Sequence, residues 1–494
     1  MTLLPRLLLV LVAFTGSALL RAASLQDEIT AFVTQPRFEG AIWGVKIVSL
    51  DSGATLAEFQ PRVRQSPASN SKLYTGALAL AHLGGNYRIR TPLLATTAVQ
   101  PDGTLPGDLV IAGRGDPSWG AREKPQEFWS VFQPFVDALR RAGVKHIRGD
   151  VVADGTWLRC APDAESWTVD DMRNDFGAEV SGVTLCDNFV ELRVAPGAKP
   201  GEPCTFEVLE PLSGLTFVNR TQTLEADAKS PRGVDTRRIF GTQTVEIVGA
   251  LPVGAKPVKT EAPVFRPAQW FAAALKEALG RAGITVDGQA RSAIWPEAPV
   301  RADVTLAVLE SPPLRELVAG FMKPSQNLET DLIFSHLGEL RRTSTTPATQ
   351  RSDELAVEAL EGFMHECGVP AKQVIFDEGS GLSRNNLTTA EATVSLLRYM
   401  ARHGEAEAFA ASLPIAGRDG SLRNRMRGTA AENNVHAKTG GLRWSATLSG
   451  YATTAAGERV AFSFMLNRHV GTPERPARAE LDELAVMLAN YAAR

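Results

Sequence analysis

The sequence predicts an α/β (α+β) protein, in which an antiparallel sheet flanked by helices is interrupted by a large mixed insert. Two strand-like segments near the start, 43–50 and 55–59, are joined by turn-forming residues and predict a hairpin. Two more, 446–452 and 459–466, precede an amphipathic final helix. The stretch between, up to about residue 301, is cut into short β-prone runs by glycine and proline. We therefore expect both chain ends to build one sheet.

The length of the chain and the change of its sequence pattern from one region to the next together predict the domain organisation. At 494 residues the chain is expected to form two to four domains, because a domain averages about 150 residues. We expect residues 24–85 and 302–494 to form one discontinuous domain and residues 86–301 an inserted region of one or two mixed domains. Helices are expected at 25–34, 73–83, 127–142, 269–282, 313–322, 352–367 and 389–402. Within the inserted region, strands are expected at 108–112 and 189–194.

The first 23 residues have the pattern of a secretory signal peptide. A basic start is followed by an apolar run from Leu7 to Leu20 and by small residues at Ala18 or at Ala22 and Ala23. We expect residues 1–23 to be removed and the mature protein to be periplasmic or otherwise secreted; an uncleaved anchor is the alternative. No later stretch is long and apolar enough to predict a stable membrane span.

Charge and cysteine content narrow the partners and the compartment. A net charge of -3 leaves no basic excess to attract nucleic acid. Four cysteines, Cys160, Cys186, Cys204 and Cys367, suit an oxidising compartment. Cys186 and Cys204 flank an expected hairpin and could pair, although four cysteines allow three connectivities. The alternative is that all four are thiols.

The first of three short motifs that point to chemistry is Ser69-x-x-Lys72, at the start of the helix expected from residue 73. Residues i and i+3 share one helical face, so the lysine lies beside the serine hydroxyl. A lysine whose pKa is lowered by burial or by a second cation can take the proton of a serine nucleophile. The helix start also favours an oxyanion.

Two further motifs follow in order, Ser325-x-Asn327 in a loop between helices and Lys438-Thr439-Gly440 on a strand. Each is weak alone. All three, in this order and in these elements, form the set found in β-lactamases and penicillin-binding proteins.

At these motifs the chain resembles the class C low-molecular-mass penicillin-binding proteins, which are D-alanyl-D-alanine carboxypeptidases and endopeptidases with a large insert. The 252 residues between Lys72 and Ser325 agree with that insert. Similar stretches extend over almost the whole mature chain, at 113–117, 167–171, 180–188, 379–384 and 417–425. The resemblance implies a penicilloyl-serine transferase (β-lactamase/transpeptidase-like) domain and a serine-type hydrolase of the cell wall, acting on peptidoglycan stem peptides.

The resemblance also implies roles for individual residues. Ser69 would be the nucleophile and Lys72 its base. Ser325 would relay a proton to the leaving amine, and Asn327 would hold the substrate and Lys72. In the third motif, Lys438 would lower the pKa of Lys72 and bind the terminal carboxylate with Thr439. Backbone amides of Ser69 and Gly441, which follows Gly440, would form the oxyanion hole.

Asp171 and Arg384 match positions that bind the zwitterionic end of a diaminopimelate side chain in related enzymes. The alternative for Asp171 is a surface carboxylate, and the alternative for Arg384 is a salt bridge that closes its loop. The chain departs from the family at Gln326, where aspartate is common, and at Gly441, where threonine or serine is usual. Phe176 replaces a frequent tyrosine.

Two alternative functions remain open, a serine β-lactamase or esterase and a catalytically silent peptidoglycan-binding scaffold. The five intact polar residues of the motifs argue against the scaffold. The histidines are scattered, so the sequence implies neither a metal nor an organic cofactor. β-Lactam antibiotics are the expected covalent inhibitors.

Overall fold

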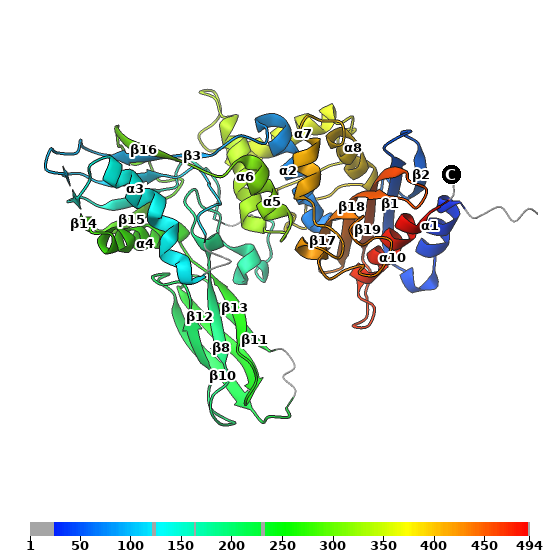
Figure 1. Ribbon diagram of the computed structural model, residues 1–494, viewed down its shortest axis with the longest axis horizontal. Coiled ribbons are helices and arrows are strands. Elements are labelled where there is room, and N and C mark those ends of the chain that lie inside the picture. The colour runs from blue at the N-terminus through cyan, green and yellow to red at the C-terminus, as the bar shows by residue number, and fades with distance from the viewer. Residues whose placement is uncertain (1–23, 121–124, 163–164, 229–232, 493–494) are drawn as a thin grey trace, which may run out of the picture.

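The computed structural model is elongated, with a sheet covered by helices at one end, a second sheet at the other and a projecting arm between them (Figure 1). It describes residues 24–120, 125–162, 165–228 and 233–492. The expected signal peptide, residues 1–23, lies outside the described residues.

The two chain ends form one five-stranded antiparallel sheet, which we call the terminal sheet. The prediction that both ends build one sheet is thus confirmed. Its order is β17-β18-β19-β1-β2, so a strand from the start of the chain pairs with one from the end. Val45, for example, pairs with both Phe464 and Phe59. The strands are β1 (Ile42–Ser49), β2 (Thr55–Phe59), β17 (His436–Leu442), β18 (Ser445–Thr453) and β19 (Arg459–Asn467).

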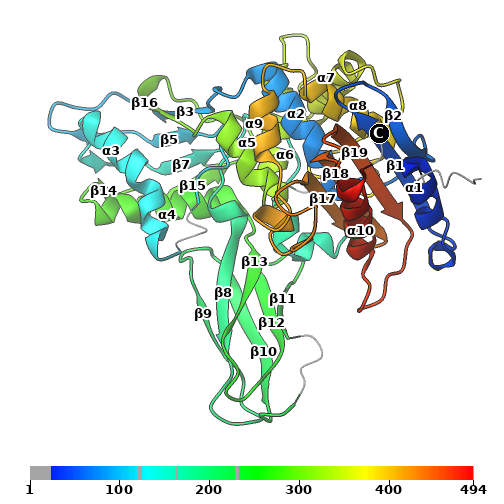
Figure 2. The same ribbon diagram turned by 45° about the vertical axis from the view of Figure 1, so that its right-hand side comes forward.

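Each face of the terminal sheet is buried against different helices. Alternate residues of a strand point to opposite faces, and the neighbours Ile47 and Val48 accordingly belong to two separate cores. One face packs against α1 (Leu25–Val33) and α10 (Ala477–Asn490), the other against α8 (Ala390–Met400). Figure 2 shows α10 and α1 in front of the strands.

A helical layer joins the terminal sheet to the insert. Its apolar core includes the buried helix α2, as the Ala- and Leu-rich sequence predicts. A long helix that begins at Asn327 was not predicted. The layer contains α2 (Ser71–Leu83), α5 (Leu314–Met322), α6 (Asn327–Leu340), α7 (Ser352–Glu366) and α9 (Ala406–Ser412).

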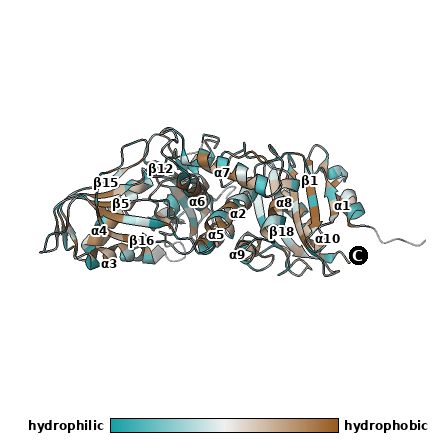
Figure 3. Ribbon diagram, turned by 90° about the horizontal axis from the view of Figure 1, so that it is seen from above, coloured by the Kyte–Doolittle hydropathy of each residue, from teal (hydrophilic) through white to brown (hydrophobic). Residues whose placement is uncertain are grey.

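The insert contains a five-stranded mixed sheet with its own core (Figure 3). Its order is β15-β7-β5-β3-β16, and its helices are α3 (Gln133–Arg141) and α4 (Pro267–Arg281). The helix expected at 127–142 is a 3₁₀ segment over Pro125–Phe132 followed by α3. The strands are β3 (Arg90–Ala95), β5 (Leu109–Ala112), β7 (Val151–Asp154), β15 (Ala290–Ala293) and β16 (Val304–Glu310), with a small sheet of β4 (Thr104–Leu105), β6 (His146–Ile147) and β14 (Thr285–Val286).

The arm is built from two three-stranded sheets, β10-β12-β11 and β13-β8-β9. Its strands are β8 (Phe189–Ala195), β9 (Thr205–Val208), β10 (Thr216–Leu224), β11 (Val234–Arg238), β12 (Thr244–Pro252) and β13 (Val258–Pro263).

The domain boundaries stay a prediction at both ends of the insert. Strand β16 begins after the expected boundary at residue 301 and pairs with β3 of the insert sheet, Val304 opposite Ala95. We therefore propose that the insert extends to about Glu310.

Two further features bear on the sequence predictions. All four cysteines are free thiols, so the suggested Cys186–Cys204 disulfide is wrong and its alternative, four thiols, holds. Cys186 and Cys204 are buried among apolar side chains of the insert core. Within the described ranges no helix combines the length and apolarity that crossing a bilayer requires.

Close packing of α6 on α7 gives a test of the helical layer. A Cβ added at Gly338 would lie 1.8 Å from the Ser352 carbonyl oxygen, whereas one added at Gly362 of α7 meets nothing within 4 Å. We expect Gly338→Ala to lower the free energy of unfolding by about 1–3 kcal/mol through overpacking. Gly362→Ala should raise it by about 0.5–1 kcal/mol by restricting the unfolded chain. Urea unfolding followed by circular dichroism measures both; equal effects would contradict this packing.

Candidate active site

Ser69 lies in a 3₁₀ turn, Ala68–Asn70, directly before α2 and half-exposed. Two hydroxyls of β18 hold the preceding chain against the terminal sheet: Thr447 Oγ1 donates to the Pro67 carbonyl at 2.8 Å and Ser445 Oγ to the Ser66 carbonyl at 2.9 Å. The turn approaches β17 so closely that a Cβ at Gly440 would lie 2.6 Å from the Pro67 oxygen. The glycine of the third motif is therefore needed for this contact.

Lys72 is fully buried and joins three segments that are distant in sequence. Its Nζ donates to Ser69 Oγ at 3.1 Å, to Asn327 Oδ1 at 2.6 Å and to the Ser380 carbonyl at 2.7 Å. These three oxygens match the three donors of an ammonium group. The first two motifs thus meet as predicted, and the carbonyl of Ser380 is a partner that the sequence did not reveal.

Ser325 and the third motif form a second contact beside the first. Lys438 is also fully buried, and its Nζ donates to Ser325 Oγ and to the Thr439 carbonyl, both at 2.8 Å. Ser325 has a φ of +74°, a conformation that costs free energy for a residue other than glycine. The loop between α5 and α6 is thus bent so that Ser325 reaches Lys438.

Two buried carboxyl groups, Asp331 and Glu378, lie behind Lys72 and were not predicted. Asp331 Oδ1 accepts from the backbone amides of Gly379 and Ser380 at 3.0 and 2.9 Å, while no donor among the described residues reaches Oδ2. Glu378 Oε1 accepts from the Gly381 amide at 2.8 Å. Together they fix the loop whose carbonyl holds Lys72. Asp331 lies one helical turn after Asn327, a spacing that could have indicated a shared face.

Burial dominates the electrostatics of both lysines. It lowers the pKa of Lys72 to about 8, against the opposing charges of Asp331 and Glu378. The pKa of Lys438 is lowered well below its ordinary value, first by burial and then by the charge of Lys72. Burial and the neighbouring Glu378 raise the pKa of Asp331 well above its usual range. Burial, one of the two causes expected for the lowered pKa of Lys72, is its largest cause.

The insert contacts this site through the Phe176 carbonyl and through Asp171. Asn327 Nδ2 donates to the Phe176 carbonyl at 2.9 Å, so the loop after residue 165 lies over the second motif. Asp171 and Arg384 form an ion pair with each other, with side chains 6% and 39% exposed. Asp171 is therefore no surface carboxylate. Arg384 also donates to the Leu382 carbonyl at 3.0 Å, on the loop that holds Lys72.

Gly441 lies at the exposed edge of β17, next to Gly440. A Cβ there would meet nothing within 4 Å, so the threonine or serine usual in the resembled family would fit. Ser421, in the 3₁₀ turn Gly420–Leu422, is another residue that the motifs did not reveal: its hydroxyl lies 2.7 Å from that of Thr439. Across the described residues no three His, Cys, Asp or Glu side chains gather as a metal site requires.

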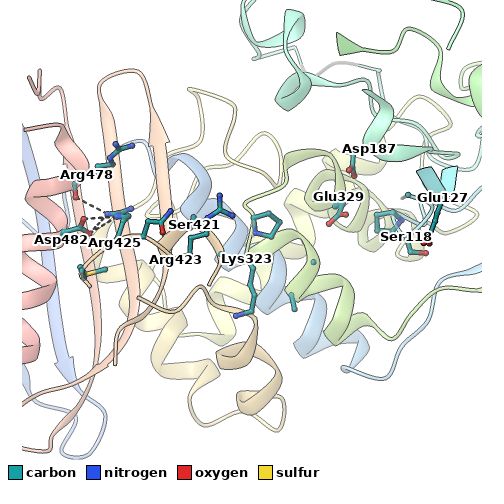
Figure 4. A pocket seen from close by; sticks show the side chains of 18 of the residues that line it. Ser118, Glu127, Asp187, Lys323, Glu329, Ser421, Arg423, Arg425, Arg478 and Asp482 are labelled. Carbon is teal, nitrogen blue, oxygen red and sulfur yellow. Dashed lines mark hydrogen bonds and ion pairs between the residues drawn. The ribbon is translucent and has the colours of Figure 1, made fainter. Parts of the chain in front are cut away.

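A cleft of about 1320 Å³ runs from α10 past Ser421 to the insert (Figure 4). Pro324, which precedes Ser325, lines it too. Basic side chains lie at the end near α10, and Glu127, Asp187 and Glu329 lie at the other. The cleft thus adjoins Ser325 and Thr439.

A serine beside a buried lysine, at the edge of an antiparallel sheet and next to a second buried lysine, defines the active-site serine enzymes of the penicilloyl-serine transferase fold. The model of the D-Ala-D-Ala carboxypeptidase 3 (S13) family matches residues 25–491. The chain belongs to this family and is a D-alanyl-D-alanine carboxypeptidase of the serine type.

Individual relatives agree with this family. The chain is 34% identical to a D-alanyl-D-alanine carboxypeptidase of an Actinomadura species, over 96% of this chain and 86% of that protein. It is 25% identical to the D-alanyl-D-alanine carboxypeptidase DacB of Haemophilus influenzae, over 88% and 87%. The crystal structure of penicillin binding protein 4 (dacB) from Haemophilus influenzae superposes with a TM-score of 0.76, covering 94% of this chain and 99% of that one.

The lowered pKa of Lys72 predicts a pH dependence. A lysine that accepts a proton must be neutral, and its neutral fraction falls tenfold for each pH unit below its pKa. We therefore expect kcat/KM for a D-alanyl-D-alanine peptide to rise about tenfold between pH 6 and 7 and to level off above about pH 8.5. A profile that is flat from pH 6 to 9, or still rising steeply at pH 10, would contradict a buried lysine base.

Proposed function

We propose that the protein hydrolyses D-alanyl-D-alanine bonds of peptidoglycan stem peptides through an acyl-enzyme on Ser69. The observation that carries this proposal is the contact of Lys72 Nζ with both Ser69 Oγ and Asn327 Oδ1. As the hydroxyl attacks the penultimate D-alanyl carbonyl, neutral Lys72 takes its proton. The backbone amides of Ser69 and Gly441 are proposed to bind the oxyanion, where the loss of one donor typically costs about 10²–10³ in rate.

Lys438 and its neighbours would act on the leaving group. Ser325, held by Lys438, passes a proton to the departing amine. Lys438 and Thr439 bind the terminal carboxylate, with Ser421 fixing the Thr439 hydroxyl. Water then hydrolyses the ester on Ser69. The same groups would accept a cross-linked peptide, which makes the protein an endopeptidase as well as a carboxypeptidase.

Asp171 and Arg384 are proposed to bind the free amine and carboxylate of a diaminopimelate residue in the stem. Their ion pair places opposite charges at one point beside the loop that holds Lys72. A zwitterion can enter such a pair by exchanging one ion pair for two, with each charge matched.

The cell-wall substrate implies a location outside the cytoplasm. We propose that residues 1–23 direct the chain to the periplasm and are then cleaved, and that β-lactam antibiotics acylate Ser69 as substrate analogues.

Labelling with a fluorescent penicillin tests the nucleophile. We expect one adduct, located on Ser69 by peptide mass analysis, and none in Ser69→Ala, which should also lose about 10⁴-fold or more of its peptidase kcat/KM. Ser52→Ala, at an exposed turn, is the matched control and should label normally. A label that survives in Ser69→Ala would place the nucleophile elsewhere, and rapid turnover of the adduct would favour a β-lactamase.

Peptides with diaminopimelate or lysine at the third position test the proposed zwitterion site. Asp171→Asn keeps the shape but removes the charge, so the preference for the diaminopimelate peptide, as a ratio of kcat/KM values, should fall about tenfold. Asp170→Asn is the control, because Asp170 is adjacent but its side chain is 90% exposed. An unchanged ratio in Asp171→Asn would remove this residue from the substrate site.

A further inference from the structure

The cleft that passes Ser421 lies on the side of the active site where Ser325 and Thr439 would contact the leaving group. This placement rests on the proposed function, in which Ser325 protonates the leaving amine and Thr439 binds its carboxylate. Pro324, directly before Ser325, lines the cleft, and so does Ser421, whose hydroxyl lies 2.7 Å from that of Thr439. A substrate that continues beyond the departing residue would extend toward this cleft, which adjoins that end of the site.

The volume of the cleft is much larger than a carboxypeptidase needs. Its leaving group is a single D-alanine, whereas pockets of about 300–1,000 Å³ already enclose drug-sized ligands. The cleft measures about 1320 Å³. It can hold several residues of a peptide.

The end of the cleft near α10 is basic, and two of its cations are available to a ligand. Arg425 is bound to Asp482 at 2.7 Å, and Lys323 to Asp419 at 2.7 Å. Arg423 and Arg478 are exposed, and in the part of the chain that the structure describes neither guanidinium forms an ion pair. Figure 4 shows both residues on the same side of the cleft as Ser421. Guanidinium groups match carboxylates in shape and charge.

We propose that Arg423 and Arg478 bind carboxylates of a second stem peptide, the acceptor half of a cross-link, while its bond to D-alanine is cleaved. A stem peptide joined through a side-chain amine keeps several free carboxylates of its own. In the reaction, the amide bond from the D-alanyl carbonyl carbon to that amine breaks and the bond to Ser69 Oγ forms. The serine proton passes through Lys72 and Ser325 to the departing amine, and water later hydrolyses the ester. The two arginines are thus a binding site for the leaving peptide.

The experiment compares a monomeric pentapeptide with a purified cross-linked peptide dimer as substrates of the same enzyme. In the double variant Arg423→Ala and Arg478→Ala, KM for the dimer should rise about fivefold to tenfold, because exposed charge pairs contribute modestly. D-Alanine release from the monomer should stay within about twofold, since neither arginine touches the catalytic groups. Lysine at both positions should restore part of the loss, and added salt should weaken dimer binding selectively in the unaltered enzyme. Arg418→Ala is the matched control, an exposed arginine of the same loop outside the cleft lining.

The outcomes distinguish a failure of the arginine site from a failure of the proposed function. If the unaltered enzyme releases D-alanine but the double variant cleaves the dimer with an unchanged KM, the arginine site is refuted alone. Equal losses on monomer and dimer would also refute it, because the arginines would then act on the terminal residue or on the fold. An unaltered enzyme that cleaves neither substrate would refute both proposals.

Discussion

The structure of the active site depends on the burial of Lys72. A buried ammonium or amine group is costly unless its hydrogen bonds are satisfied, and here three oxygens from three separate segments satisfy them. These hydrogen bonds therefore require α2, α6 and the loop after Phe376 to lie close together. The same burial lowers the pKa of Lys72 to about 8, so one constraint both joins the segments and makes the lysine a competent base near neutral pH.

The other elements of the fold place Lys72 and its hydrogen-bond partners at a surface where a peptide can lie. Hydroxyls of β18 hold the turn of Ser69 at the sheet edge, and β17 carries Lys438 alongside. Both chain ends supply this sheet, so the long insert can leave after α2 and return before α5 without disturbing it. The insert contributes in turn, since the Phe176 carbonyl orients the Asn327 amide.

Most of the framework was predictable from local sequence signals. The terminal hairpin, the strands after residue 435 and the buried helix after Ser69 follow from hydrophobic patterns and turn residues. The three motifs predicted which side chains meet. Asp331 and the carbonyl contact of Phe176 were missed because each joins a side chain to a backbone group of a segment distant in sequence. Glu378 was missed because it lies outside the three motifs and binds within its own loop, at the Gly381 amide. The suggested pairing of Cys186 and Cys204 was wrong because proximity in sequence does not set the distance between two thiols.

The ionisation of Lys72 can be measured directly by heteronuclear NMR of the protein with isotope-labelled lysine side chains, titrated from pH 6 to 11. The account predicts a lysine signal with a pKa near 8 that is absent from Lys72→Ala. If the signal lost in Lys72→Ala instead titrates near the value of about 10.4 of a free lysine side chain, Lys72 is an ordinary ammonium group at neutral pH and cannot be the base assigned to it.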